Sequence, residues 1–85
     1  MAIKNEEQRQ RIGQRIAELR NAKGMTQQDV ADKTGLLRQH ISRIEAGKYA
    51  VTLEVIQAIA EALGMTVDII DPGLQDLAPL KRLTP

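Results

Sequence analysis

The fold is decided by residues 27–46, whose sequence is QQDVADKTGLLRQHISRIEA. Two short helices that meet at a sharp angle need a small residue at their contact, a residue that tolerates positive φ in the turn, and apolar anchors. Ala31 meets the first need and Gly35 the second. The anchors are Val30, Leu36, Ile41 and Ile44. We therefore expect two helices joined by a tight turn, the second of them over residues 37–46.

Helical periodicity continues on the N-terminal side of this pair. An amphipathic helix is expected over residues 6–23, with Ile12, Ile16 and Leu19 on its apolar face. Thr26 and Asp29 form a capping-box pattern, which predicts that the next helix begins directly after Thr26. These two helices are separated only by a glycine-containing turn.

A fourth helix is expected between Thr52, as its N-cap, and Gly64. Its apolar stripe consists of Leu53, Ile56, Ile59, Ala60 and Leu63. The fold class that follows is all-α, a compact domain of four to five helices over residues 1–64. The 85 residues suffice for one such domain.

The pattern changes after Gly64, where Met65, Val67 and Ile69 alternate with polar residues. A period of two predicts a short strand, at residues 65–71. We expect no partner strand elsewhere in this helical chain, so the strand would pair with its own copy across a two-fold axis. Residues 72–85 begin with Pro72 and contain the two other prolines of the chain, and they are expected to form a loosely held tail.

Charge is divided unevenly along the chain. Residues 1–48 contain ten Lys/Arg and six Asp/Glu, whereas residues 49–80 contain five Asp/Glu and no Lys/Arg. A basic half of this kind suits a polyanionic partner, although ordinary solvated charge is the default explanation when the asymmetry is taken alone.

Several functional classes are disfavoured. The chain has no cysteine, one histidine and no Ser/His/Asp set or phosphate-binding glycine loop, so neither an enzyme nor a metal or cofactor site is expected. A single aromatic residue argues against binding of single strands by stacking. No signal peptide or membrane span is evident, and the expected location is the cytoplasm.

The sequence resembles a known family, the lambda-repressor-like helix-turn-helix regulators, also called the Xre or Cro/repressor type. The resemblance covers about residues 12–65. It rests on the motifs LRxxKGMTQQDVA at 19–31, where this chain has Asn and Ala at the variable positions, GLLRQHISRIEAGK at 35–48, and LxxIxxIAxALG at 53–64. It implies a transcriptional regulator, more often a repressor, that binds a two-fold operator in double-stranded DNA as a homodimer.

The resemblance also implies how DNA is bound. In the family the third helix enters the major groove, so the base-contacting residues would be Arg38, Gln39 and Arg43. Gln27 would bridge the phosphate backbone and the edge of the groove. His40 is, on the sequence alone, a base contact, a phosphate contact or an ordinary surface residue.

Phosphate contacts are implied at the rim of that helix pair. The residues at the matching positions are Thr26, Gln28, Lys48 and Tyr49. Lys48 could equally be a solvated loop residue, and Tyr49 could fold over the core.

Arg20 and Glu45 are assigned to structure, because the family pairs these two positions in a salt bridge between the first and third helices. One departure from the family is Leu37, which stands where many members have a capping Ser or Thr. Loss of a side-chain cap costs on the order of 1 kcal/mol and makes the exact start of the third helix uncertain.

A second function class is an antitoxin that represses its own operon and binds a toxin protein. A helix-turn-helix followed by a dimerising strand is similar to several such proteins. Leu74, Leu77 and Leu80 in the tail would then contact the toxin, although a frayed terminus explains them more simply.

Overall fold

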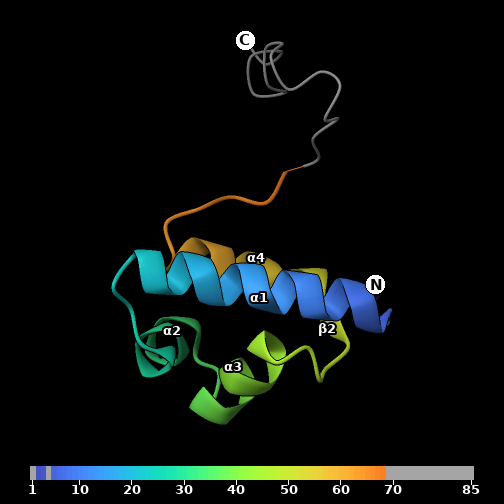
Figure 1. The fold of residues 1–85 in the computed structure, drawn as a ribbon. Helices are drawn as coiled ribbons and strands as arrows, with labels where there is room; N and C mark the ends of the chain where they lie inside the picture. The colour runs from blue at the N-terminus through green and yellow to red at the C-terminus, as the bar shows by residue number, and fades with distance from the viewer. Residues whose placement is uncertain (1, 4, 69–85) are drawn as a thin grey trace, which may run out of the picture.

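The computed structural model describes residues 2–3 and 5–68, with side chains from Asn5 onward. Four helices follow one another in it: α1 (Glu6–Ala22), α2 (Gln27–Thr34), α3 (Arg38–Glu45) and α4 (Leu53–Ala62). In Figure 1 the long α1 crosses the molecule, with α2 and α3 together on one side of it. This arrangement confirms the expected all-α helix-turn-helix domain.

The helix boundaries follow the predicted capping signals. The side chain of Thr26 accepts a hydrogen bond from Asp29 N, and Asp29 in turn accepts from Thr26 N, so the capping box of α2 is complete. Thr52 caps α4 in the same way, by accepting from Val55 N. Gly35 ends α2 with φ of 79°, a left-handed conformation that a glycine adopts without strain.

The core is built from aliphatic side chains of all four helices. Ile41, Ile44 and Ile59 of α3 and α4 are at most 1% exposed, and Val30 of α2 is fully buried. Within the described residues, the other buried apolar side chains are those of Ile16, Ala31, Val51 and Leu63. Because one face of α3 is part of this core, the opposite face is fixed in its orientation toward solvent.

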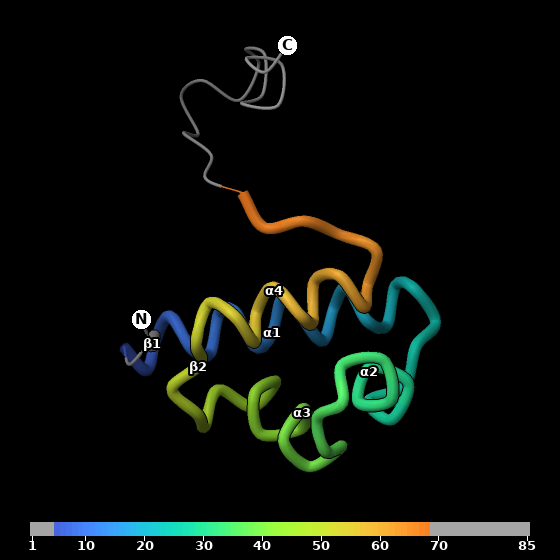
Figure 2. Tube along the Cα trace, turned by 180° about the vertical axis from the view of Figure 1, so that it is seen from behind, coloured from blue at the N-terminus to red at the C-terminus, as the bar shows by residue number. Residues whose placement is uncertain are grey.

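One expectation about strands was wrong. The structure contains a two-stranded antiparallel pair, β1 (Ala2–Ile3) with β2 (Val51–Thr52). Figure 2 shows β1 at the N-terminal end of α1, beside the segment that leads into α4. The expectation of no strand outside residues 65–71 is therefore wrong, because residues near the N-terminus pair with the segment before α4.

The region after α4 bears on the predicted dimerising strand. Met65 packs against the core and residues 65–68 form no strand within the single chain. Val67 is 42% exposed. Ile69, the rest of the predicted strand, and the tail with Leu74, Leu77 and Leu80 lie outside the described residues.

Candidate nucleic-acid interface

The two faces of α3 differ completely in burial. Ile41 and Ile44 are 0% and 1% exposed, whereas Arg38, Gln39 and Arg43 are all exposed. The helix thus presents two guanidinium groups and one carboxamide to solvent over less than two turns. On a flat polar edge, each guanidinium can donate to two acceptors at once. The carboxamide can donate to one acceptor and accept from one donor.

The turn between α2 and α3 is held by the Thr34 hydroxyl. Thr34 Oγ1 donates to Val30 O at 2.8 Å and accepts from Leu36 N at 3.2 Å. Leu36 is half-buried against the core, and Ala31 in α2 is only 2% exposed, where the helices approach each other. The angle between α2 and α3 is therefore set by local bonds and packing.

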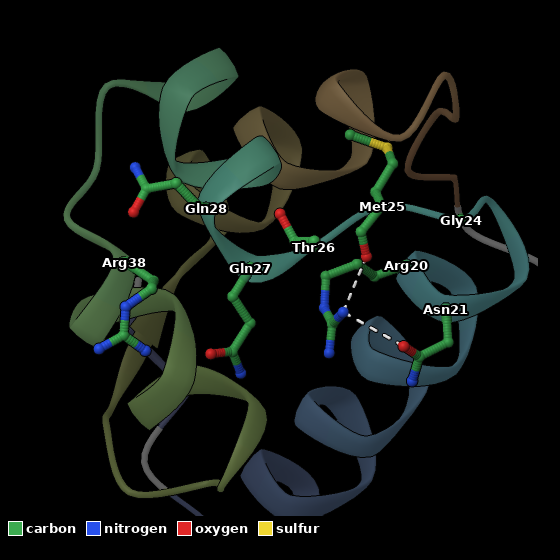
Figure 3. A pocket seen from close by; sticks show the side chains of 8 residues that line it. All are labelled: Arg20, Asn21, Gly24, Met25, Thr26, Gln27, Gln28 and Arg38. Carbon is green, nitrogen blue, oxygen red and sulfur yellow. Dashed lines mark hydrogen bonds between the residues drawn. The ribbon is translucent and has the colours of Figure 1, made fainter.

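The N-terminal ends of α2 and α3 surround a shallow open depression. Its lining, drawn in Figure 3, includes Arg20, Thr26, Gln27, Gln28 and Arg38. Four of these were predicted to contact DNA, and the fold brings them together from two helices. Gln28 Nε2 donates to Asp32 Oδ1 at 2.8 Å, which holds the Gln28 side chain along α2.

The Asp29 carboxylate stabilises the start of α2 at this site. The backbone N–H and hydroxyl of Thr26 hold the pKa of Asp29 below its ordinary value of 3.8. The carboxylate is therefore ionised at neutral pH and lies at the positive end of the helix dipole. Asp29 thus stabilises the helix end beside the candidate interface and is not part of the exposed face of α3.

Arg20 and Glu45 form the expected salt bridge. Arg20 Nε lies 2.7 Å from Glu45 Oε2 and Nη2 lies 3.0 Å from Oε1, with side chains 12% and 8% exposed. Arg20 Nη1 also donates to Met25 O at 2.8 Å, a bond drawn in Figure 3. The hydrogen bond with Glu45 raises the pKa of Arg20 further above its ordinary value.

Gln27 takes part in this network, which the sequence did not indicate. Its Nε2 donates to Glu45 Oε1 at 3.1 Å, and the side chain is half-buried. The first residue of α2 is thereby joined to the end of α3, with Glu45 accepting from both α1 and α2. Gln27 also lines the shallow depression, and Figure 3 shows its side chain between those of Arg38 and Arg20 in this view.

Tyr49 organises the C-terminal end of the exposed face. Its hydroxyl accepts a hydrogen bond from Arg43 Nη1 at 2.6 Å, and the Arg43 Cζ atom lies 5.6 Å from the ring centroid. His40 contacts the same ring edge-on, with ring centroids 4.9 Å apart. Tyr49 is half-buried against the core, as the alternative to a phosphate contact expected.

A close approach between α1 and α3 was missed by the sequence analysis. A Cβ atom at Gly13 would lie 2.3 Å from Ile44 O and 2.6 Å from Glu45 O, so only glycine fits. Arg9 Nε donates to Gly47 O at 3.2 Å nearby. The available signal was an isolated glycine inside a helical pattern, which often marks a tight packing contact.

The other predicted residues are more scattered. Lys48 is exposed, and its backbone N–H donates to Arg43 O at 3.0 Å beyond the end of α3. Of the predicted dimerising residues, Met65 packs against the protein's own core and Val67 is exposed. Within residues 5–68 no three His, Cys, Asp or Glu residues are grouped closely enough to bind a metal ion, and no helix is long and apolar enough to cross a membrane.

Comparison with known families assigns the chain to one of them. The helix-turn-helix family model matches residues 16–70, nearly two thirds of the chain. The chain belongs to this family. Its members of the Xre or lambda-repressor-like type are DNA-binding transcriptional regulators, and the matched residues include all of α2, α3 and α4.

Relatives agree with the family assignment. The chain is 34% identical over 65 residues to the uncharacterized HTH-type transcriptional regulator y4dJ of Sinorhizobium fredii, covering 75% of this chain and 84% of the relative. It is 37% identical to the immunity repressor protein of Bacillus phage phi105, covering 69% of this chain but only 41% of the repressor.

A solved structure extends the likeness to the fold. The restriction-modification controller protein C.Esp1396I, solved as a tetramer in complex with its natural 35 base-pair operator, superposes with a TM-score of 0.65 at 33% identity. The match covers 68% of this chain and 76% of the controller protein.

Proposed function

We propose that this helix-turn-helix regulator binds double-stranded DNA sequence-specifically, with the exposed face of α3 in the major groove. The observation that carries the proposal is the division of α3 into a core face with Ile41 and Ile44 and a solvent face with two arginines and a glutamine. A helix fits the major groove of B-form DNA, and a rigid attachment to the core presents its side chains in a defined geometry.

Arg38, Gln39 and Arg43 are the proposed base contacts. Arginine bonds bidentately to guanine O6 and N7, and glutamine to adenine N6 and N7, each good pair contributing roughly 1–3 kcal/mol of discrimination. Tyr49 supports Arg43 through the bond to its hydroxyl, which limits the rotamers of Arg43 before DNA arrives. His40, half-buried beside the same ring, is the proposed neighbour at the edge of this contact.

Thr26, Gln28, Lys48 and Tyr49 are the proposed phosphate contacts, with Gln27 at the edge of the groove. Thr26 and Gln28 lie at the start of α2, and Lys48 and Tyr49 follow the end of α3, so they flank α3 from both ends. The Tyr49 hydroxyl accepts from Arg43 and still has its own proton to donate to a phosphate oxygen. Such contacts position the protein without selecting a sequence.

The proposed assembly is a homodimer on a two-fold operator, acting as a repressor. Support comes from two similar proteins: one is a phage immunity repressor, and the other is a tetramer on its operator. The exposed Val67, the third residue of the segment 65–71, is available for the contact between two copies. Two-fold symmetry would place two copies of α3 about one helical turn of DNA apart.

The test is selection of bound duplexes from a random pool by the whole protein. The expected product is a pair of inverted half-sites with a fixed spacing. Affinity for the selected duplex is expected to fall steeply as the salt concentration rises, because Lys and Arg side chains displace counterions from the DNA phosphates. Recovery of no consensus, or an affinity insensitive to salt, would contradict the proposal.

A further inference from the structure

Leu37, the N-cap residue of α3, is the most exposed large apolar side chain among the described residues. It is 70% exposed, compared with 50% for Leu53 and 42% for Val67. Its neighbour Leu36 packs against the core. Among the described residues, Leu37 does not belong to the core or to the side chains packed against it. The side chain therefore contributes little to burial in the free protein.

Leu37 also fails to cap its helix. The N-cap side chains of the other three helices, Asn5, Thr26 and Thr52, each accept a hydrogen bond from a backbone N–H. Leu37 has the same extended backbone conformation, with φ of −74° and ψ of 146°, but makes no side-chain cap. A leucine here thus destabilises the free protein in two ways, because the helix lacks a side-chain cap and an apolar side chain is exposed to water.

The position of Leu37 suggests what offsets this cost. It directly precedes Arg38, at the end of α3 that borders the shallow depression shared with the start of α2. If α3 occupies the major groove, this end faces base edges. The one apolar group that unmodified bases present there is the C5-methyl of thymine.

We propose that Leu37 contacts the 5-methyl group of a thymine adjacent to the base bound by Arg38. This inference rests on the proposed DNA-binding function of α3. Leu37 then selects thymine over cytosine, which has a hydrogen at the same position and presents no methyl group to bury.

The experiment uses the duplex obtained by selection, with each thymine of a half-site replaced in turn by deoxyuridine. That replacement removes the methyl group and leaves base pairing unchanged. At one thymine position of the half-site, replacement is expected to weaken binding about fourfold, which is the loss expected for one buried methyl group. Leu37→Ser and Leu37→Ala are expected to bind thymine and deoxyuridine at that position equally.

Two controls separate this contact from general effects of the substitution. Leu53→Ser removes another exposed leucine, on α4, and is expected to keep the full preference for thymine. Leu37→Ser supplies the missing cap and is expected to raise the melting temperature by roughly 4–8 °C, whereas Leu37→Ala adds no cap. Weaker thymine preference in a more stable protein cannot be attributed to unfolding.

The possible outcomes distinguish this inference from the proposed function. Salt-dependent, sequence-specific binding without deoxyuridine sensitivity at any position would overturn the role of Leu37 and leave the function of α3 intact. The same holds if Leu37→Ser and Leu37→Ala retain the deoxyuridine effect, or if the half-site contains no thymine. Absence of sequence-specific binding would overturn both.

Discussion

The face of α3 that meets α1 and the face that meets solvent serve different purposes. On the inner side, Gly13 approaches the α3 backbone too closely for any Cβ, and Arg20 holds Glu45 at two points. On the outer side, Arg38 and Gln39 are exposed. The buried side that fixes the helix and the exposed polar side that we propose binds DNA are therefore opposite sides of one eight-residue helix. Substitutions on the two sides should therefore change different measurable properties.

The largest effect is expected for Gly13→Ala. The added Cβ would meet two backbone carbonyls of α3 closer than 3 Å, and neither can move without separating the helices. Overpacking of this kind should lower the free energy of unfolding by about 3 kcal/mol. Urea denaturation measures it, with the exposed Gln14→Ala on α1 as a control near wild type. An unchanged stability for Gly13→Ala would show that α1 and α3 are not locked at this contact.

Arg20→Ala is expected to lower the free energy of unfolding by about 2 kcal/mol. The substitution leaves the mostly buried Glu45 carboxylate without its ionic partner and frees Met25 O. The base preference of whatever DNA binding remains should be unchanged. Thermal unfolding and duplex selection measure the two properties. Unchanged stability together with lost DNA binding would contradict the structural role and assign Arg20 to the interface.

Tyr49→Phe should affect the outer face and leave stability within about 0.5 kcal/mol of wild type. It removes the hydroxyl that accepts from Arg43 and keeps the ring against His40. Discrimination at the base contacted by Arg43 should fall about fivefold, the equivalent of one hydrogen bond, with the base contacted by Arg38 unaffected. Binding to variant duplexes measures this. An equal loss on every sequence would leave Tyr49 with a phosphate contact only.

The smallest effect concerns Asp29, whose pKa in the folded protein lies below 3.8. Because the unfolded state binds the proton more tightly, this group stabilises the fold above about its ordinary pKa, and the contribution is lost as the pH falls through the folded value. Asp29→Asn should flatten the acid dependence of thermal stability below about pH 4 and leave base preference unchanged. An identical acid dependence in both proteins would show that the capping box contributes no linked stability.

Many of the structural features on the two sides of α3 could be predicted from the sequence, because they depend on local signals. The capping box at Thr26, the glycine after α2 and the periodic isoleucines of α3 determine local structure within a few residues. The salt bridge between Arg20 and Glu45 followed from the family resemblance, since nothing local relates two residues 25 positions apart.

The features that escaped prediction depend on how elements cross in space. The need for glycine at position 13 arises only when α1 passes over the end of α3 at this distance. The strands Ala2–Ile3 and Val51–Thr52 have two residues each, too few to show an alternating pattern. The bond between Gln27 and Glu45 needs both helices in place. Such contacts require the tertiary structure.

Base reading by α3 is measured most directly by comparing Arg38→Ala with Lys48→Ala on a set of duplexes that differ by one base pair. Arg38 lies on the outer face of α3 and Lys48 follows its end, and both are exposed. Arg38→Ala is expected to lose roughly 1–3 kcal/mol of discrimination at one base position, whereas Lys48→Ala should weaken binding to all duplexes alike. The reverse pattern, with sequence preference lost in Lys48→Ala and kept in Arg38→Ala, would show that Arg38 does not contact a base.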